Sequence, residues 1–284
     1  MKRGAALALA FSATVWAQNP PVFRTRTDVV TVDVAVSRGR LPVTGLTASD
    51  FTLLDNGVPQ KVEAISIESI PLDVSLVVDL SGSTSSSLNR FKADIERMVG
   101  MLRATDRVRL IRFAEDVRQV VPMQPATSPL PLDDLRTGQG TALNDALFVA
   151  LSKTPEVGRR HLVVVFTDAD DTWSTLPNSS LPVIAGRADA VLHVVLSTYD
   201  RTPQPGVLSS REALRSAASA TGGDVRYLRD AVNAFRQVLD EFRTSYLLRY
   251  TPEGVPREGW HELDVRITRP GTYVVRARKG YFGG

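Results

Sequence analysis

Five consecutive residues, Asp79-Leu80-Ser81-Gly82-Ser83, carry the side chains best suited to chemistry in this sequence. They place one carboxylate and two hydroxyls at alternate positions of a short loop, and Gly82 allows that loop to curl tightly. Hard oxygen donors suit a hard cation, and Mg²⁺ takes six oxygens while keeping several waters. The segment alone is a modest signal for a metal site, because serine-rich loops often only cap helices.

Two further residues with oxygen-bearing side chains stand at comparable places in the chain. Thr141 follows two glycines and opens an expected helix over residues 142–151, where the simpler role of its hydroxyl is a helix cap. Asp168 directly follows the apolar run 161–167, where the simpler role is a cap or a turn. Each residue is weak evidence alone, but their order behind Asp79 predicts one divalent-metal site.

A mostly parallel sheet is needed to bring these side chains together. Residues 72–80 form an apolar run broken only by Asp73 and Ser75 before Asp79, as is typical of a strand buried on both faces. Apolar residues from Leu88 to Leu102 then recur at spacings of 3 and 4, which indicates an amphipathic helix. Ligands bind at the carboxyl ends of such strands. Further strands are expected over 108–113, 161–167, 191–196 and 224–228, and further helices over 142–151, 211–220 and 231–242.

Both ends of the chain are expected to be β-structure. Residues 29–36 alternate between apolar and polar, and Asp55-Asn56-Gly57 is a strong hairpin turn between the extended runs 51–54 and 58–67. Three more strand-like runs follow residue 244. Because a sheet of two or three strands is marginally stable alone, residues 28–70 and 245–280 are expected to pack as one small β-sandwich-like domain. Residues 72–243 would then be a domain inserted between Pro71 and Thr244.

The composition is that of an ordinary globular protein, with 284 residues, 43% hydrophobic and 23% charged residues, and a net charge of +3. The basic residues are scattered rather than clustered, which argues against a nucleic-acid function. The sequence contains no cysteine, so neither a disulfide nor a lipidated cysteine is possible.

The N-terminus has the pattern of an export signal. Lys2 and Arg3 precede a short apolar stretch, and Val15 and Ala17 have the spacing of a cleavage site. We therefore expect residues 1–17 to be a signal peptide cut after Ala17. The alternative, an N-terminal membrane anchor, would need about 20 apolar residues. The expected location is the periplasm or the exterior, with no membrane span after cleavage.

The candidate metal ligands resemble the metal-ion-dependent adhesion site of von Willebrand factor A-type (VWA) domains. The matching stretches are DLSGS, GQGTALNDAL and FTDADD, and the resemblance covers about residues 72–243. It implies a doubly wound, mostly parallel, Rossmann-like α/β fold and one bound divalent cation, Mg²⁺ or alternatively Mn²⁺ or Ca²⁺. It also implies that Ser81, Ser83 and Thr141 coordinate the ion, and that Asp79 and Asp168 act directly or through water.

One residue departs from the family pattern: Ala169 stands where VWA domains usually have glycine after the second aspartate. Asp145, Asp170 and Asp171 lie close by in sequence and are interpreted as supporting or solvated residues. The flanks, LPVTGLTASDFTLLDNGVPQKV and YVVRARKGYF, resemble a bacterial exported VWA-related family common in Acidobacteria. That second resemblance implies no defined activity.

The candidate metal ligands predict a binding protein whose metal ion binds a glutamate or aspartate carboxylate of a partner protein. An envelope scaffold with an idle metal site is an alternative. A hydrolase is less favoured, because a phosphatase of the haloacid dehalogenase type needs a second aspartate where Ser81 stands, and a serine hydrolase needs Gly-x-Ser-x-Gly. The histidines, His161, His193 and His261, do not have metal-ligand spacing. We therefore expect no enzymatic activity.

Overall fold

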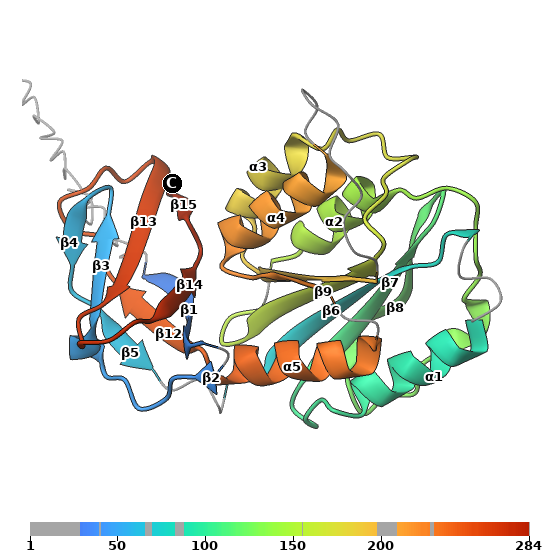
Figure 1. The fold of residues 1–284 in the computed structure, drawn as a ribbon, viewed down its shortest axis with the longest axis horizontal. Helices are drawn as coiled ribbons and strands as arrows, with labels where there is room; N and C mark the ends of the chain where they lie inside the picture. Colours follow the sequence, from blue (N-terminus) through green and yellow to red (C-terminus); the bar gives the residue numbers. More distant parts are fainter. Residues whose placement is uncertain are drawn as a thin grey trace, which may run out of the picture.

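The structure is a computed structural model that describes residues 29–39, 41–65, 70–82, 88–154, 156–197, 209–227 and 230–283. The predicted signal peptide and Ser83 lie outside these residues. An α/β part and a β-rich part lie side by side, as Figure 1 shows.

A six-stranded sheet forms the centre of the α/β part, in the order β11-β10-β9-β6-β7-β8. Its neighbouring strands pair in parallel except for β8, which is antiparallel to β7. Every residue of β6 and β9 is buried, which agrees with their mostly apolar sequences. The strands are β6 (Leu72–Asp79), β7 (Arg107–Phe113), β8 (Val117–Pro125), β9 (Arg160–Thr167), β10 (Val191–Leu196) and β11 (Val225–Tyr227).

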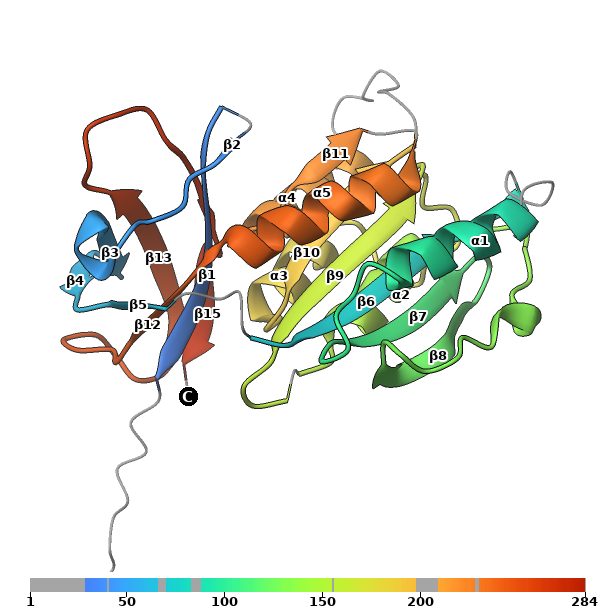
Figure 2. The same cartoon turned by 90° about the horizontal axis from the view of Figure 1, so that it is seen from below.

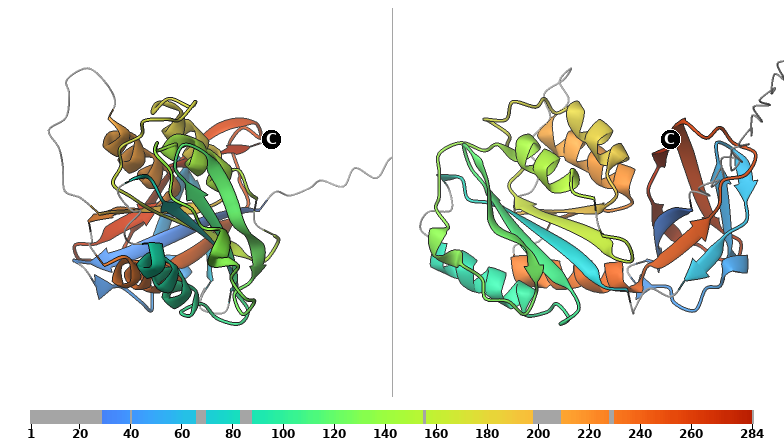
Figure 3. Two further views of the ribbon diagram at one scale, coloured as in Figure 1. Left: turned by 90° about the vertical axis from the view of Figure 1, so that its right-hand side faces the viewer. Right: turned by 180° about the vertical axis from the view of Figure 1, so that it is seen from behind.

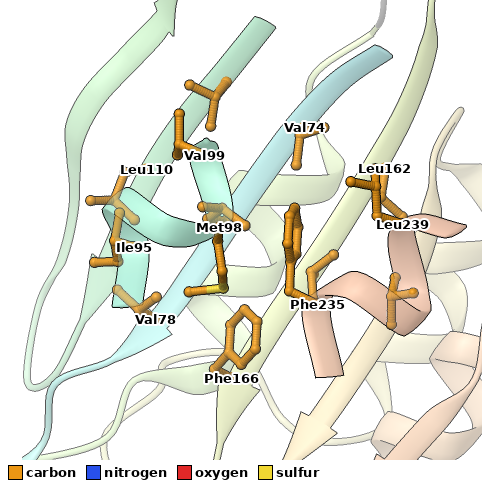
Figure 4. Close-up of a cluster of buried hydrophobic side chains, with 14 of the residues drawn as sticks. Val74, Val78, Ile95, Met98, Val99, Leu110, Leu162, Phe166, Phe235 and Leu239 are labelled. Atoms are coloured by element: carbon orange, nitrogen blue, oxygen red, sulfur yellow. The ribbon is translucent and has the colours of Figure 1, made fainter. Parts of the chain in front are cut away.

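Helices cover both faces of this sheet (Figures 1 and 2). On one face, Val74 and Val78 of β6 pack with Ile95 of α1 and Phe235 of α5 in the cluster drawn in Figure 4. On the other face, Val77 packs with residues of the remaining three helices. The helices are α1 (Leu88–Val99), α2 (Leu143–Leu151), α3 (Ser180–Arg187), α4 (Ser210–Thr221) and α5 (Ala231–Thr244), and a 3₁₀ turn spans Leu132–Asp134.

The β-rich part contains strands from both ends of the chain. One sheet has the order β14-β1-β12-β5 with β2 added beside β1, and the other has the order β15-β13-β3-β4. Asn56 and Gly57 have φ angles of 47° and 80°, as the predicted hairpin turn requires. The bounds are β1 (Val30–Arg38), β2 (Leu41–Pro42), a 3₁₀ turn (Ala48–Asp50), β3 (Phe51–Asp55), β4 (Val58–Gln60), β5 (Glu63–Ile65), β12 (Tyr246–Tyr250), β13 (Gly259–Ile267), β14 (Val274–Ala277) and β15 (Gly280–Gly283).

Polar contacts join the two parts, which Figure 3 shows from two further sides. Arg160, at the start of β9, donates to Asp33 of β1 over 2.6 Å and lies over the Phe242 ring. Glu241 of α5 accepts from Arg226 of β11 and from Arg276 of β14. The start of β9 therefore faces the β-rich part.

The predicted fold class, a doubly wound and mostly parallel α/β sheet beside antiparallel β-structure, is confirmed. The sequence did not reveal β8 or α3. The edge strand β8 contains Pro122, which is tolerated there because an edge strand leaves some N–H groups unpaired. Helix α3 was missed because it contains Pro182 and Gly186, which are poor helix formers. Proline is nevertheless acceptable in a first helical turn. Helix α1 ends at Val99, three residues before the predicted Leu102, and Gly100 follows it.

Candidate metal centre

The candidate site lies where the connections of the sheet diverge. From β6 the chain passes through α1, on one face, to β7, whereas α2, on the opposite face, leads into β9. Strands β6 and β9 are hydrogen-bonded neighbours. Asp79 is the last residue of β6, and Asp168 directly follows β9. Both aspartates therefore occupy the carboxyl ends of adjacent parallel strands at a topological switch point, where open α/β sheets bind ligands.

Asp79 is a buried carboxylate held by hydrogen bonds from Ser81 and Thr167. Its Oδ1 accepts the Ser81 N–H at 3.0 Å, and its Oδ2 accepts the Thr167 hydroxyl at 2.7 Å. Burial raises the pKa of Asp79, the hydrogen bonds from Ser81 and Thr167 oppose that rise, and the negative charge of Asp168 adds to it. Within the described part of the chain, neither aspartate forms an ion pair with a basic side chain. Two acidic groups thus lie together, and no basic side chain in the described ranges is ion-paired with either carboxylate.

The glycine loop before Thr141 lies directly against the loop that follows Asp79. The N–H of Gly138 donates to the carbonyl of Leu80 at 3.0 Å, and the Gly138 carbonyl lies 3.5 Å from where a Gly82 Cβ would stand. A Cβ on Gly138 would come within 1.8 Å of Glu115, so glycine is required at that position. The loop after Asp79 and the loop before Thr141 are therefore in direct contact.

Thr141 does not serve as the cap of α2. The N-cap residue is Ala142, which makes no side-chain cap hydrogen bond. The N–H of Asn144 in the first turn instead donates to Asp171 at 2.8 Å and to Ser174 at 3.0 Å. Other residues therefore fill the capping role, and Thr141 is buried in the loop whose Gly138 contacts Leu80.

Asp168 is half-buried and begins a tight loop. Its Oδ1 accepts the N–H of Asp170 at 3.3 Å, which is a turn contact, and its carbonyl accepts from Arg211 at 3.0 Å. The next residue, Ala169, has a φ of 74°, the left-handed region that glycine adopts freely. The loop thus keeps the backbone conformation that the usual glycine allows, at a cost of roughly 1–2 kcal/mol of strain.

Two of the three neighbouring acidic residues hold the loop rather than face a ligand. Asp171 accepts from Asn144 and Ser174, and Asp145 accepts the N–H groups of Thr175 and Leu176 at 2.9 and 3.0 Å. These contacts fasten the loop after β9 to the start of α2. The prediction that these acids support the site fits this geometry.

The donors of the candidate site suit a hard cation. Asp79, Ser81 and Asp168 lie at one end of the sheet with the Thr141 loop against them, whereas Ser83 lies outside the described residues. Among the residues that the structure describes, no three histidine, cysteine, aspartate or glutamate side chains are grouped to hold a metal by themselves. A cation here would therefore depend on serine and threonine hydroxyls and on water, which magnesium accepts.

Two supporting residues were missed by sequence reasoning. Thr167 donates its hydroxyl to Asp79 and accepts the N–H of Ala169 at 3.1 Å, so it links both strand ends. Glu115, in the turn between β7 and β8, accepts the N–H of Gln139 at 2.7 Å. Thr167 precedes Asp168 in the sequence and could have been noticed, but Glu115 is brought to the site only by the unpredicted hairpin.

The comparisons with known proteins agree with this architecture. Residues 74–191 match the family profile of a VWA-like domain (DUF2201). A von Willebrand factor type A protein from Catenulispora acidiphila is similar in structure, with 12% identity and a TM-score of 0.51, over 92% of this chain and 76% of that one. Residues 74–191 are therefore similar to a VWA-like domain, and the fold around them is similar to that of VWA-type proteins.

Two further solved structures are similar. Proximal thread matrix protein 1 from the mussel byssus, with a zinc-occupied MIDAS motif, has 13% identity and a TM-score of 0.50, over 66% of this chain and 49% of that one. An aerotolerance-related membrane protein from Bacteroides fragilis has 20% identity and a TM-score of 0.46, over 60% and 98%. No curated protein matches the chain. At these identities the similarity shows the fold alone.

Proposed function

We propose that this protein binds one divalent cation, Mg²⁺ or alternatively Mn²⁺ or Ca²⁺, through five residues and uses it to bind a partner protein. The ion would lie between the ends of β6 and β9. A glutamate or aspartate side chain of the partner would complete its coordination. The proposed ligands are Asp79, Ser81, Ser83, Thr141 and Asp168.

The observation that carries the proposal is the pair of neighbouring aspartates, whose carboxylates form no ion pair with a basic side chain among the residues that the structure describes. Asp79 is only 5% exposed, and the charge of Asp168 acts against its ionisation. Burying a carboxylate is costly unless it is paired or coordinates a metal. A divalent cation bound there would supply the missing positive charge and would keep a coordination position for an incoming carboxylate.

The candidate metal centre lies where a partner protein could reach it. Arg160 starts β9 in contact with the β-rich part, whereas Thr167 ends β9 beside Asp79. The eight residues of β9 span roughly 23 Å at about 3.3 Å per residue. The site therefore lies at the end of the sheet away from the β-rich part, which leaves it free for another protein.

Binding fits these residues better than catalysis. His161 contacts Ser75 inside the sheet, His193 lies in β10 near Glu241, and His261 contacts Asp55 in the β-rich part. None of them stands at the candidate metal centre as a general base. The chain offers no second aspartate in the Asp79 loop for phosphoryl transfer.

Export to the periplasm or the exterior is part of the proposal and rests on residues 1–17. No helix among the described residues is long and apolar enough to cross a membrane. The zinc-occupied MIDAS motif of the mussel byssus protein supports a divalent cation at this site.

The proposal is tested by capturing partners from the envelope fraction of the source organism by cross-linking. Wild-type protein should retain a partner in Mg²⁺, lose it in EDTA and regain it when Mg²⁺ is restored. Asp79→Ala should lose the same partner, whereas Asp133→Ala, which changes an exposed aspartate of the 3₁₀ turn, should retain it. A partner that is bound equally in EDTA would contradict the proposal. Metal binding without any metal-dependent partner would support the scaffold alternative.

A further inference from the structure

Trp173 presents a large aromatic side chain beside the candidate metal centre. It is 64% exposed, although a tryptophan side chain usually buries most of its area in a folded protein. It stands five residues after Asp168, in the loop between β9 and α3. A large apolar side chain left in water at such a place is a candidate contact for a partner.

The base of the Trp173 side chain is fixed against the loop that carries Thr141. The N–H groups of Thr172 and Trp173 both donate to the carbonyl of Thr141, at 3.0 and 3.1 Å. The Thr141 N–H donates back to the Thr172 hydroxyl at 3.2 Å. A Cβ on Gly140 would stand 3.0 Å from Cγ and Cδ2 of Trp173, so the indole lies directly over that glycine.

This arrangement sets the distance between the indole and a metal-bound carboxylate. Gly140 is the residue next to Thr141, a proposed metal ligand, and consecutive Cα atoms are about 3.8 Å apart. A partner segment that gives one carboxylate to the cation therefore has its neighbouring side chains within reach of the indole. Tryptophan fixed in this way loses little conformational freedom on binding, which is why it is common among residues that dominate interfaces.

The surroundings favour an apolar side chain over a charged one. Asp171, Asp145 and Glu115 are three of the nearby carboxylates, and each already accepts backbone N–H groups of the protein. The Trp173 indole is therefore the apolar group beside the metal centre that a partner side chain can contact. Burying apolar area against it contributes about 25 cal/mol per Å².

We infer that Trp173 selects partners whose metal-binding glutamate or aspartate is flanked by an apolar side chain. This inference rests on the proposed function of the metal centre and adds the chemistry of the partner. The metal would hold the carboxylate, and the indole would cover the adjacent apolar side chain. Trp173 is thus a specificity-determining residue and not a metal ligand.

The test uses three capped tripeptides as probes, Leu-Glu-Leu, Ala-Glu-Ala and Lys-Glu-Lys, titrated into the full chain in Mg²⁺ and followed by NMR. Wild type should bind Leu-Glu-Leu at least about 5-fold more tightly than Ala-Glu-Ala, from the apolar area covered. In Trp173→Ala this preference should fall below about 2-fold. Trp260→Phe, a change to the exposed tryptophan of the β-rich part, should keep it.

The outcomes separate this inference from the proposed function. Affinity of Trp173→Ala for Mg²⁺ should stay within about 2-fold of wild type, which also shows that the loop is intact. Equal binding of the leucine and alanine peptides, a preference that survives in Trp173→Ala, or tightest binding of Lys-Glu-Lys would overturn the inference. Metal-dependent peptide binding in any of those cases would leave the proposed function standing. Failure of all three peptides to bind at about 10 mM would overturn the inference, and EDTA-sensitive partner capture would then decide the proposed function separately.

Discussion

At the scale of single residues, Ala169 shows how the site tolerates a departure from its family. Its φ of 74° is strained for any residue with a Cβ, yet its side chain is buried in the core beneath α2, α3 and α4. Replacement by glycine would relieve roughly 1–2 kcal/mol of strain. It would also remove a buried methyl group worth about 0.8 kcal/mol and add about 0.5–1 kcal/mol of chain entropy to the unfolded state.

Because these terms offset each other, Ala169→Gly should change the free energy of unfolding by less than about 1 kcal/mol. It should also leave the affinity for Mg²⁺ unchanged. Ala169→Val should be destabilising by about 2 kcal/mol or more, because a branched side chain is poorly accommodated at positive φ. Urea unfolding and metal titration measure both effects. A large stabilisation by glycine would show that the buried methyl contributes little.

Buried histidines predict how stability depends on pH. Arg109 donates to the Ser75 hydroxyl at 2.6 Å, and that hydroxyl lies 2.7 Å from Nε2 of His161. Burial, aided by the Arg109 charge, lowers the pKa of His161 to about 4, and burial lowers that of His193 to about 3. In the unfolded chain both groups titrate near 6.5.

Between pH 6.5 and about 4 the unfolded chain therefore binds more protons than the folded chain, and stability falls as the pH falls. From pH 6.5 to pH 5 each histidine should cost about 2 kcal/mol in the free energy of unfolding. His161→Gln should remove its share of that slope. Urea unfolding at several pH values checks this result, and an equal slope in His161→Gln and wild type would contradict the assignment to His161.

The sequence indicates the candidate ligands but not the residues that support them. Asp79 and Asp168 could be predicted because each follows a continuous apolar strand, and chain order then places them at one sheet edge. The part played by Glu115 depends on a hairpin between β7 and β8 that the sequence pattern does not reveal. Contacts made only by tertiary packing leave no periodic signal in the sequence.

At the scale of elements, the start of α2 depends on a residue distant in sequence. Asp171 accepts the Asn144 N–H at 2.8 Å and the Ser174 hydroxyl at 2.6 Å, and so it acts as a cap supplied by the loop after β9. Asp171→Ala should cost about 1–2 kcal/mol, as the loss of a helix cap does. It should also weaken Mg²⁺ binding about 10-fold, because it loosens the loops that carry Thr141 and Asp168.

Chemical denaturation and calorimetry on Asp171→Ala, with exposed Asp133→Ala as the matched control, measure the two effects. Unchanged stability and metal affinity in Asp171→Ala would show that the loop is held by its other contacts. Elements themselves were predictable where burial was continuous, as in β6 and β9, or where amphipathic periodicity was strong, as in α1 and α5. They were not predictable where proline obscured the pattern, as in β8 and α3.

At the scale of the whole molecule, we propose that the α/β part (72–243) and the β-rich flanks (28–70 and 245–280) unfold as one unit because of their shared contacts. Arg160 is central to these contacts. Besides Asp33, it donates to the Phe242 carbonyl and to the Ser245 hydroxyl, each at 2.9 Å, and its guanidinium centre lies 3.8 Å from the Phe242 ring centroid. It is only 4% exposed.

Arg160→Ala should lower the free energy of unfolding by at least about 3 kcal/mol, because it leaves buried acceptors without their donor. It should also split thermal unfolding into two transitions. Arg249→Ala, which changes an exposed arginine of β12, should alter stability by less than about 0.5 kcal/mol. Differential scanning calorimetry makes the comparison. A single, unshifted transition in Arg160→Ala would show that the two parts are coupled by other contacts.

The central claim is that Asp79 anchors a divalent cation, and calorimetric titration of the full chain with Mg²⁺ tests it most directly. Wild type should bind one ion, and Asp79→Ala should bind it at least about 10-fold more weakly. Ser81→Ala, Ser83→Ala and Thr141→Ala should show smaller losses, since each removes one neutral donor. Asp134→Ala, an exposed control, should match wild type. Absence of binding to wild type, or equal affinity in wild type and Asp79→Ala, would contradict the claim.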